Sequence, residues 1–342
     1  MLSVHSSPLG RLGSADTGGM SIYLLELASE LGRRGHGVDI FTRQTTHGWQ
    51  QVVAYAPHVR VINLAVEGTE GLSRSALFEH LDRFCTVIDS FIRQKGGSYD
   101  LIHSNYWLSG VVGEQLKRLW HCPHAVTFHT LAAVKMAAFP GHVEEKNRID
   151  EETRLLQCCD GVIVPTEEEG QYLASMITDE GAAIYHIPWG VNMDRFKTAD
   201  PAPAKHKNGG LEAGPLVLFV GRFDPMKGVD LAIRSVYHLA DSNEIQLFII
   251  GGDGPSSGPY QKIEHYVNEL GIGEQVQLIG PVEHSQMVRY YQKADVVVIS
   301  SRYESFGLVI LEALASGTPV ASTPVGIAPH VILQGTNGSS WR

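Results

Sequence analysis

The sequence predicts an α/β protein with two doubly wound domains that face a central cleft. The chain has 342 residues, more than one ordinary core accommodates. Short runs rich in Val, Ile and Leu alternate with amphipathic runs, as expected for parallel strands that helices cover on both faces. The alternation breaks once, at residues 191–215, where Pro, Gly and charged residues gather. We therefore expect an N-terminal domain at 1–195, a linker at 196–215 and a C-terminal domain at 216–342.

The predicted strands are short and largely apolar segments. They lie at residues 3–6, 38–42, 100–104, 124–129, 161–165 and 183–187 in the first half, and at 216–221, 246–250, 276–280, 295–300 and 319–322 in the second. The first helix is predicted from a stripe of apolar residues with i, i+3, i+4, i+7 spacing, namely Leu24, Leu27, Ala28 and Leu31. Gly35 supplies the signal that ends this helix.

Composition narrows the range of partners. The chain has 27 Lys and Arg against 37 Asp and Glu, so its net charge of −10 gives no field that favours nucleic acid. No apolar run approaches the ~18 residues of a membrane span, and the N-terminus lacks a signal-peptide core. The cytoplasm is therefore the default location, with peripheral membrane contact left open.

The four cysteines form no C-x-x-C pair, which favours reduced thiols over a disulfide or metal site. The oligomeric state is not determined by these features.

Ligands of open parallel sheets bind beyond the carboxyl ends of the strands. Residues suited to ligand binding follow predicted strands in both halves of the chain: Gly18-Gly19, Tyr106, His129, Arg222 and Glu304. We expect these residues to converge on one cleft.

Two loops have the chemistry of phosphate binding. Gly18 and Gly19 open the first helix, where the absence of side chains lets an anion approach backbone N–H groups. A tight turn is the alternative interpretation of this glycine pair. In "GRFDPMKG", Arg222 and Lys227 are two cations that could clamp a diphosphate. The alternative for this loop is ordinary exposed surface charge.

The stretch "ESFGLVILE" combines two carboxylates with a helix start. A helix is predicted from near Gly307 to before Gly317, so that the amides of Phe306, Gly307 and Leu308 can face a phosphate. Carboxylates repel phosphate but accept hydrogen bonds from hydroxyl groups. A nucleotide-sugar offers both groups, with Glu304 on the sugar and Glu312 on the ribose. The alternatives are a helix N-terminal charge for Glu304 and an exposed helix residue for Glu312.

These motifs, in this order, resemble those of the GT-B retaining glycosyltransferases of family 4, which includes sucrose-phosphate synthases and inositol-phosphate glycosyltransferases. "ESFGLVILE" resembles the family's E-x7-E motif, "GRFDPMKG" its diphosphate loop, "DTGGM" its glycine loop and "IPWGVNMDRF" the entry to its interdomain segment. The resemblance implies two Rossmann-like domains, the first binding the acceptor and the second the nucleotide-sugar. It also implies a hexosyltransferase with a UDP-sugar or other NDP-sugar as co-substrate and no required cofactor. No D-x-D spacing occurs, so no required metal is expected.

The resemblance also assigns roles to residues. Arg222 and Lys227 bind the diphosphate, Glu304 contacts the donor sugar and Glu312 the ribose, and Gly18-Gly19 approach the phosphates. His129 lies near the transferred sugar and positions substrate.

"HSNYWLSG" and "HTLAAVK" are most similar to the inositol-phosphate and sucrose-phosphate branch, in which a phosphorylated acceptor is bound. The matching residues are Tyr106, Thr130 and Arg148, with weaker matches at Arg74 and Lys135. The alternative for Arg148 is pairing with the acidic residues around it in "EEKNRIDEETR". For catalysis the resemblance implies a front-face mechanism, in which the leaving phosphate takes the acceptor's proton.

The sequence departs from the family's pattern at three places. Ser21 stands where the inositol-phosphate branch usually has Asn, and Ile327 and His330 stand where Gly and Glu are common. Relatives usually continue beyond "GTNGSSWR", so we expect a truncated C-terminal domain. This leaves open a catalytically weak or inactive sugar-nucleotide-binding protein as one alternative function. An NAD-dependent oxidoreductase is a second, although "IIGGDGPSSG" lacks the G-x-G-x-x-G spacing.

Overall fold

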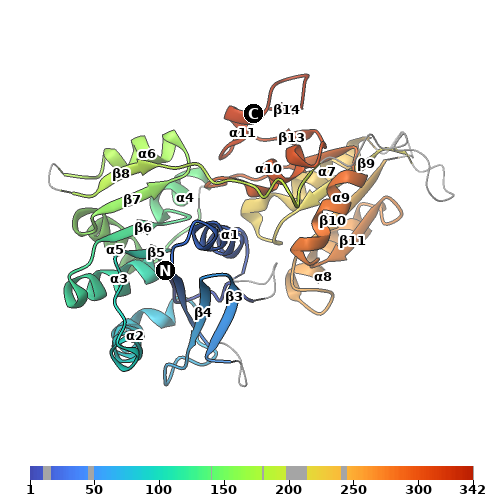
Figure 1. Ribbon diagram of the computed structural model, residues 1–342. Coiled ribbons are helices and arrows are strands. Elements are labelled where there is room, and N and C mark those ends of the chain that lie inside the picture. Colours follow the sequence, from blue (N-terminus) through green and yellow to red (C-terminus); the bar gives the residue numbers. More distant parts are fainter. Residues whose placement is uncertain are drawn as a thin grey trace. The chain divides into compact units, whose positions relative to one another are not determined.

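The computed structural model describes residues 1–10, 17–44, 50–139, 141–178, 181–197, 214–239 and 245–341. The chain forms two compact units, of which the first comprises Met1–Gly10 and Gly19–Pro188, and the second contains Trp189–Arg342. Each unit holds one sheet with helices around it (Figure 1). Most of the predicted linker at 196–215 lies outside the described residues, and the contacts place the unit boundary at Pro188.

The first unit is built on an eight-stranded sheet in the order β3-β4-β2-β1-β5-β6-β7-β8. Its strands are β1 (Leu2–Ser3), β2 (Val38–Arg43), β3 (Val52–Ala56), β4 (Val59–Leu64), β5 (Ile102–Asn105), β6 (His124–Thr127), β7 (Gly161–Val164) and β8 (Ala183–His186). Neighbouring strands are parallel except for the antiparallel pair β3 and β4. Strand β1 is central, since Leu2 pairs with Phe41 of β2 on one side and with Ser104 of β5 on the other.

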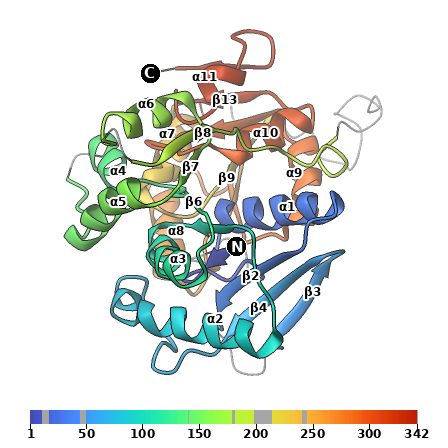
Figure 2. The same ribbon diagram turned by 60° about the vertical axis from the view of Figure 1, so that its left-hand side comes forward.

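Helices cover both faces of this sheet. They are α1 (Gly19–Arg33), η1 (Ala76–His80), α2 (Leu81–Lys95), α3 (Trp107–Trp120), α4 (Ala132–Ala138), α5 (Lys146–Cys158) and α6 (Glu167–Ala174). Strand β2 is buried along its whole length, and its alternate side chains enter different cores. Ile40 packs with Leu24 and Ala28 of α1, whereas Phe41 packs in the larger core beneath α2 and α3. In both views β2 and β4 lie between α1 and α2 (Figures 1 and 2).

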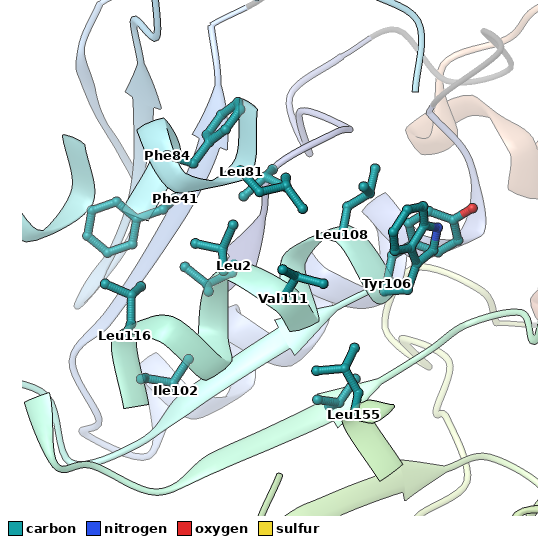
Figure 3. Close-up of a cluster of buried hydrophobic side chains, with 14 of the residues drawn as sticks. Leu2, Phe41, Leu81, Phe84, Ile102, Tyr106, Leu108, Val111, Leu116 and Leu155 are labelled. Atoms are coloured by element: carbon teal, nitrogen blue, oxygen red, sulfur yellow. The ribbon is translucent and has the colours of Figure 1, made fainter. Parts of the chain in front are cut away.

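The larger core joins strands and helices from distant parts of the sequence. Figure 3 shows Leu2, Phe41 and Ile102 from the strands packed among side chains of α2, α3 and α5. Phe41 and Leu2 are each 2% exposed. Truncating a buried Phe of this kind to Ala costs about 3–5 kcal/mol of stability, so this core contributes strongly to the stability of the first unit.

The second unit has a six-stranded, wholly parallel sheet in the order β11-β10-β9-β12-β13-β14. The strands are β9 (Leu216–Val220), β10 (Gln246–Ile250), β11 (Val276–Gly280), β12 (Val296–Ile299), β13 (Val320–Ser322) and β14 (Gly338–Ser340). The helices are η2 (Pro225–Lys227), α7 (Val229–Leu239), α8 (Gly258–Glu269), η4 (His284–Gln286), α9 (Met287–Lys293), α10 (Leu308–Ala315) and α11 (Ala328–Val331). No helix in the described ranges is both long and apolar enough to cross a membrane.

The predicted fold class is confirmed. Each predicted strand overlaps an observed one, and the first helix ends at Arg33, with Gly35 in the left-handed region at φ 90°. Three strands escaped the sequence analysis: β3, β4 and β14. Strand β3 lies at the edge of its sheet and is largely exposed, so it lacks the apolar run of a strand covered on both faces.

Each sheet has one point where the strand order reverses. In the first unit the reversal lies between β1 and β5, and in the second between β9 and β12. Ligands of doubly wound sheets bind at the carboxyl ends of these strands. The loops that follow β5, β9 and β12 carry Tyr106, Arg222 and Glu304, so the topology places these three predicted residues at the switch points, whereas His129 follows the neighbouring strand β6.

Candidate functional site

Two loops of the second unit meet at the switch point between β9 and β12. Lys227, at the end of η2, places its Nζ 2.7 Å from Glu304 Oε1. Ser301 Oγ donates a hydrogen bond to the same oxygen at 2.8 Å. Both side chains keep some exposure, 25% for Lys227 and 15% for Glu304. The structure therefore brings together two residues that the sequence analysis assigned to the diphosphate and to the sugar.

Gly228 allows this close approach. Its φ is +66°, and a Cβ there would lie 2.0 Å from the carbonyl oxygen of Ser300, at the end of β12. Only glycine fits both conditions. Ser300 Oγ in turn donates to the carbonyl of Gly228 at 2.7 Å. The glycine therefore fixes the position of Lys227 relative to the loop that carries Glu304.

Arg222 lies on the same loop as Lys227. Its Nη2 is 3.6 Å from Asp224 Oδ2, and its side chain is 38% exposed. Asp224 is also the N-cap of η2, since its carboxylate accepts from the amide of Met226 at 2.9 Å. The loop is thus ordered by its own hydrogen bonds while the guanidinium stays accessible to an anion.

Helix α10 begins where the sequence predicted. Gly307 is its N-cap, with φ 92° in the left-handed region, and no side chain of a described residue caps the helix. The Phe306 side chain is buried against the Trp189 ring, with centroids 5.1 Å apart. Phe306 therefore offers only its backbone to a ligand. The first N–H groups of a helix have no partner within it, so the Phe306–Leu308 turn retains the chemistry of an anion site.

Glu312 is buried inside the second unit. It is 4% exposed, and both carboxylate oxygens already accept hydrogen bonds. His284 Nε2 lies 2.7 Å from Oε1, and the Tyr291 hydroxyl lies 2.7 Å from Oε2. Burial and the adjacent carboxylate both raise the pKa of Tyr291 well above its usual value, so it stays a hydroxyl donor. The alternative of an exposed helix residue is wrong. His284 and Tyr291 could not be predicted from the sequence, because neither belongs to a motif.

The first unit gathers the predicted acceptor residues around Arg148. Arg148 Nη2 donates to the carbonyl oxygen and to Oγ1 of Thr130, at 2.8 and 3.1 Å. Its guanidinium carbon lies 5.0 Å from the centre of the Tyr106 ring. Arg74 approaches the same ring, with Nη1 3.5 Å from the Tyr106 hydroxyl. Cations and hydroxyl groups from separate elements thus meet in one place, as recognition of a phosphate requires.

Acidic residues share this cluster. Glu144 accepts from Lys135 Nζ at 2.8 Å and from Arg148 Nη1 at 2.9 Å. Glu152 accepts from Arg148 Nε at 2.7 Å, and these two side chains are each 5% exposed. Arg148 therefore does pair with neighbouring acids, as the alternative held, and it also contacts Thr130 and Tyr106. Burial raises the pKa of Glu144, but its bonds to Lys135 and His142 and the charge of Arg148 outweigh burial and hold it at about 2.

The backbone is strained at both strand ends beside this cluster. Tyr106 has φ 76° and ψ 156°, and His129 has φ 63°. Residues other than glycine rarely adopt such backbone conformations. His129 Nε2 lies 2.9 Å from Asn105 Oδ1. Burial, with a further contribution from His103, lowers the pKa of His129 to about 3, so the ring is neutral near pH 7. Strain of this kind persists where surroundings enforce it and is frequent at functional sites.

The glycine pair lies at the start of α1. Gly19 is the first residue of the helix, and a Cβ on Gly18 would meet no heavy atom of a described residue within 4 Å. The described part of the chain therefore leaves the space beside Gly18 open. Ser21, the predicted departure from the inositol-phosphate branch, is buried, and its Oγ has no hydrogen-bond partner among the described residues. The described residues contain no group of three His, Cys, Asp or Glu side chains that could hold a metal ion.

Comparison with known proteins identifies the class. Residues 18–183 match the glycosyl transferase 4-like domain, and residues 202–340 match the glycosyl transferases group 1. The D-inositol 3-phosphate glycosyltransferase of Xylanimonas cellulosilytica is 36% identical over 347 residues, covering 99% of this chain and 83% of the relative. The protein of the same name from Corynebacterium jeikeium is 39% identical over 351 residues, with the same two coverages. The structure of sucrose-phosphate synthase from Thermosynechococcus elongatus superposes with a TM-score of 0.89 at 33% identity, covering 99% of this chain and 84% of that one.

The chain belongs to the group 1 glycosyltransferases of family 4, which have the GT-B fold. It is a glycosyltransferase that takes its sugar from a nucleotide-sugar donor. This membership confirms the family resemblance and argues against the alternative function of an NAD-dependent oxidoreductase.

Proposed function

We propose that the protein is a retaining hexosyltransferase that moves a sugar from a UDP-sugar to a small phosphorylated acceptor, without a metal ion. The first unit binds the acceptor and the second binds the donor. The observation that carries the proposal is the convergence of Arg74, Lys135 and Arg148 with the hydroxyl groups of Tyr106 and Thr130.

The charge balance of that cluster supports a phosphate ligand. Three cations stand against two carboxylates, Glu144 and Glu152, so the cluster retains net positive charge. Arginine suits phosphate because its planar fork gives paired hydrogen bonds, whereas lysine supplies a point charge. Relatives that share 36–39% identity are named for D-inositol 3-phosphate, a phosphorylated polyol. Ser21 in place of Asn favours testing other phosphorylated polyols and hexoses as well.

The donor would lie against the second unit. Arg222, Lys227 and the Phe306–Leu308 amides bind the diphosphate, Glu304 accepts from sugar hydroxyls, and Glu312 accepts from the ribose. Gly18 and Gly19 approach the phosphates. The Lys227–Glu304 ion pair supports these roles, because it holds a phosphate-binding cation beside a hydroxyl-binding carboxylate.

The chemistry is a front-face substitution. The acceptor oxygen bonds to the anomeric carbon on the side from which the diphosphate departs, so the configuration is retained. A departing phosphate oxygen takes the proton of the acceptor hydroxyl. Arg222, Lys227 and the α10 amides stabilise the negative charge that grows on the leaving group. Neutral His129 positions the sugar as a hydrogen-bonding group and takes no part as a nucleophile.

A substrate screen tests this function. UDP-glucose and UDP-N-acetylglucosamine would be incubated with D-inositol 3-phosphate, hexose phosphates and their unphosphorylated counterparts, and products identified by mass spectrometry and NMR. We expect transfer to a phosphorylated acceptor only, with retained anomeric configuration. Equal transfer to free and phosphorylated acceptors would refute the phosphate site. Donor binding by calorimetry without transfer to any acceptor would favour the alternative of an inactive sugar-nucleotide-binding protein.

A further inference from the structure

The hydrogen bonds of Glu312 suggest that other residues hold its carboxylate in the orientation that a ligand needs. Glu312 lies on α10, whereas its partners His284 and Tyr291 come from η4 and α9. Each partner contacts a different carboxylate oxygen, both at 2.7 Å. A carboxylate offers about four acceptor positions. The side chains of the described residues fill two of them, one on each oxygen, and the other two match the two adjacent hydroxyl groups of a ribose.

The proton on His284 is fixed by a third residue. Arg195 Nη1 lies 3.0 Å from His284 Nδ1. Arginine can only donate hydrogen bonds, so Nδ1 must accept and the ring proton is on Nε2. That proton points to Glu312. Arg195 therefore selects the tautomer of His284 that donates to the carboxylate.

Arg195 is held by a turn that packs on the same helices. The backbone carbonyl of Asn192 accepts from the amides of Arg195 and Phe196 at 3.1 and 2.9 Å. The buried Phe196 ring lies 5.1 Å from the His284 ring and 6.0 Å from the Tyr291 ring. Gln292 on α9 donates to the carbonyl of Lys197 at 2.8 Å. Residues 192–197, through which the chain enters the second unit, thus form part of the support for Glu312.

We propose that Tyr291 and His284 are positioning residues that aim Glu312 at the ribose hydroxyls of the donor nucleotide, and that Arg195 sets His284 in its donating state. The inference rests on the proposed role of Glu312 at the ribose. Without the two donors, the buried carboxylate would turn away from the ribose or lose the hydrogen bonds that hold it in place. Selectivity for a ribonucleotide over a deoxyribonucleotide is then a property of all four residues.

Calorimetry of the full-length protein with UDP and with 2′-deoxy-UDP tests this. Removing one hydroxyl that bonds a charged carboxylate should weaken binding to the wild type by roughly tenfold or more. Tyr291→Phe removes only an oxygen and should reduce this preference towards onefold. His284→Leu should do the same, whereas His284→Gln, which keeps an N–H near the Nε2 position, should retain most of it. Tyr290→Phe, on the same helix, is the matched control and should behave as wild type.

Arg195→Leu tests the effect of Arg195 on the His284 tautomer without altering the residues that contact Glu312. It should lower the preference for UDP by a smaller factor, and ¹⁵N NMR of His284 should show loss of the single Nε2–H tautomer. A wild-type preference that survives in Tyr291→Phe and in folded His284→Leu would overturn the positioning role while leaving the proposed function intact. Absence of any preference in the wild type would overturn the ribose assignment of Glu312 itself, and with it this inference.

Discussion

Arg148 in the first unit and Lys227 in the second are both assigned to phosphate groups, yet the protein holds them differently. The Arg148 side chain is 5% exposed and bonds to Thr130, Glu144 and Glu152. Lys227 is 25% exposed and forms an ion pair with Glu304, which lies in the loop after β12. Buried contacts already order the side chains of the first site, whereas the charged side chains of the second site stay partly exposed, where a ligand can reach them. Mutations should therefore affect stability at the first and binding at the second.

Replacing Arg148 should produce the largest effect. Arg148→Met leaves Glu152 buried without its cation, and breaking a buried pair in this way costs about 3–5 kcal/mol of folding free energy. Urea denaturation of the full chain measures this, and transfer to the acceptor should also be lost. Arg93→Met, which breaks an exposed pair with Asp89, is the control and should cost about 0–1 kcal/mol. Similar losses for both variants would mean that Arg148 is not a structural centre.

Gly228→Ala should disturb both stability and donor binding. The new Cβ clashes with the Ser300 carbonyl, so the loop must move and carry Lys227 away from Glu304. Gly271 is a matched control, because it has φ +69° and open space around its Cβ. Gly271→Ala should cost only the left-handed strain of about 1–2 kcal/mol and leave UDP binding unchanged. If both variants bind UDP as the wild type does, the close contact with Ser300 has no bearing on the site.

Lys227→Ala should weaken UDP-sugar binding while leaving the fold stable. Hydrogen bonds to charged groups contribute about 1.5–3 kcal/mol, which corresponds to a loss of roughly ten- to a hundredfold in affinity. Isothermal calorimetry measures the change, with the exposed Lys262→Ala as control. Unchanged affinity would show that the diphosphate lies elsewhere.

Glu304→Gln should reduce the rate of sugar transfer more than it reduces the affinity for UDP. The neutral side chain keeps its shape but loses the charge that sugar hydroxyls and Lys227 bind, so we expect transfer to fall by roughly tenfold, about 1.4 kcal/mol of activation free energy. UDP itself should bind with a smaller change. Equal losses in transfer and in UDP affinity would move Glu304 away from the sugar.

The stability of the first site should also depend on pH in the acid range. The folded-state pKa of Glu144 is about 2 against 4.5 normally, so the ionised form stabilises the fold above pH ~4.5. That contribution should decline as the pH falls from ~4.5 towards 2. Glu144→Gln should therefore flatten the loss of unfolding free energy over this interval relative to wild type. A parallel decline in both proteins would show that the Lys135, His142 and Arg148 contacts do not stabilise the carboxylate.

Sequence reasoning succeeded where a signal was local. Buried parallel strands such as β9 and β12 are continuous apolar runs, and the predicted site residues Arg222 and Glu304 lie in the loops that follow them. The start of α10 was predicted from Gly307 and the apolar run behind it. The edge strand β3 gave no such pattern, because its exposed face accepts many residue types.

Contacts between distant residues could not be predicted from the chain alone. His284 and Glu312 are 28 residues apart, and Arg195 and His284 are 89 apart. The packing of η4, α9 and α10, together with the turn at 192–197, brings them together. The burial of Glu312 was missed for the same reason. The sequence analysis recognised a carboxylate on a helix, but the depth of that helix position depends on what packs over it.

The packing of residues 189–197 on the second unit bears on how such enzymes could be recombined. Trp189 and Phe196 are part of the second unit's interior, although they precede its first strand. A chimaera that grafts this second unit onto the first unit of another family member should therefore be joined at Pro188. A junction nearer Leu216 would replace residues 192–197 with a foreign turn, and the proposed support of Glu312 would then come from the other parent.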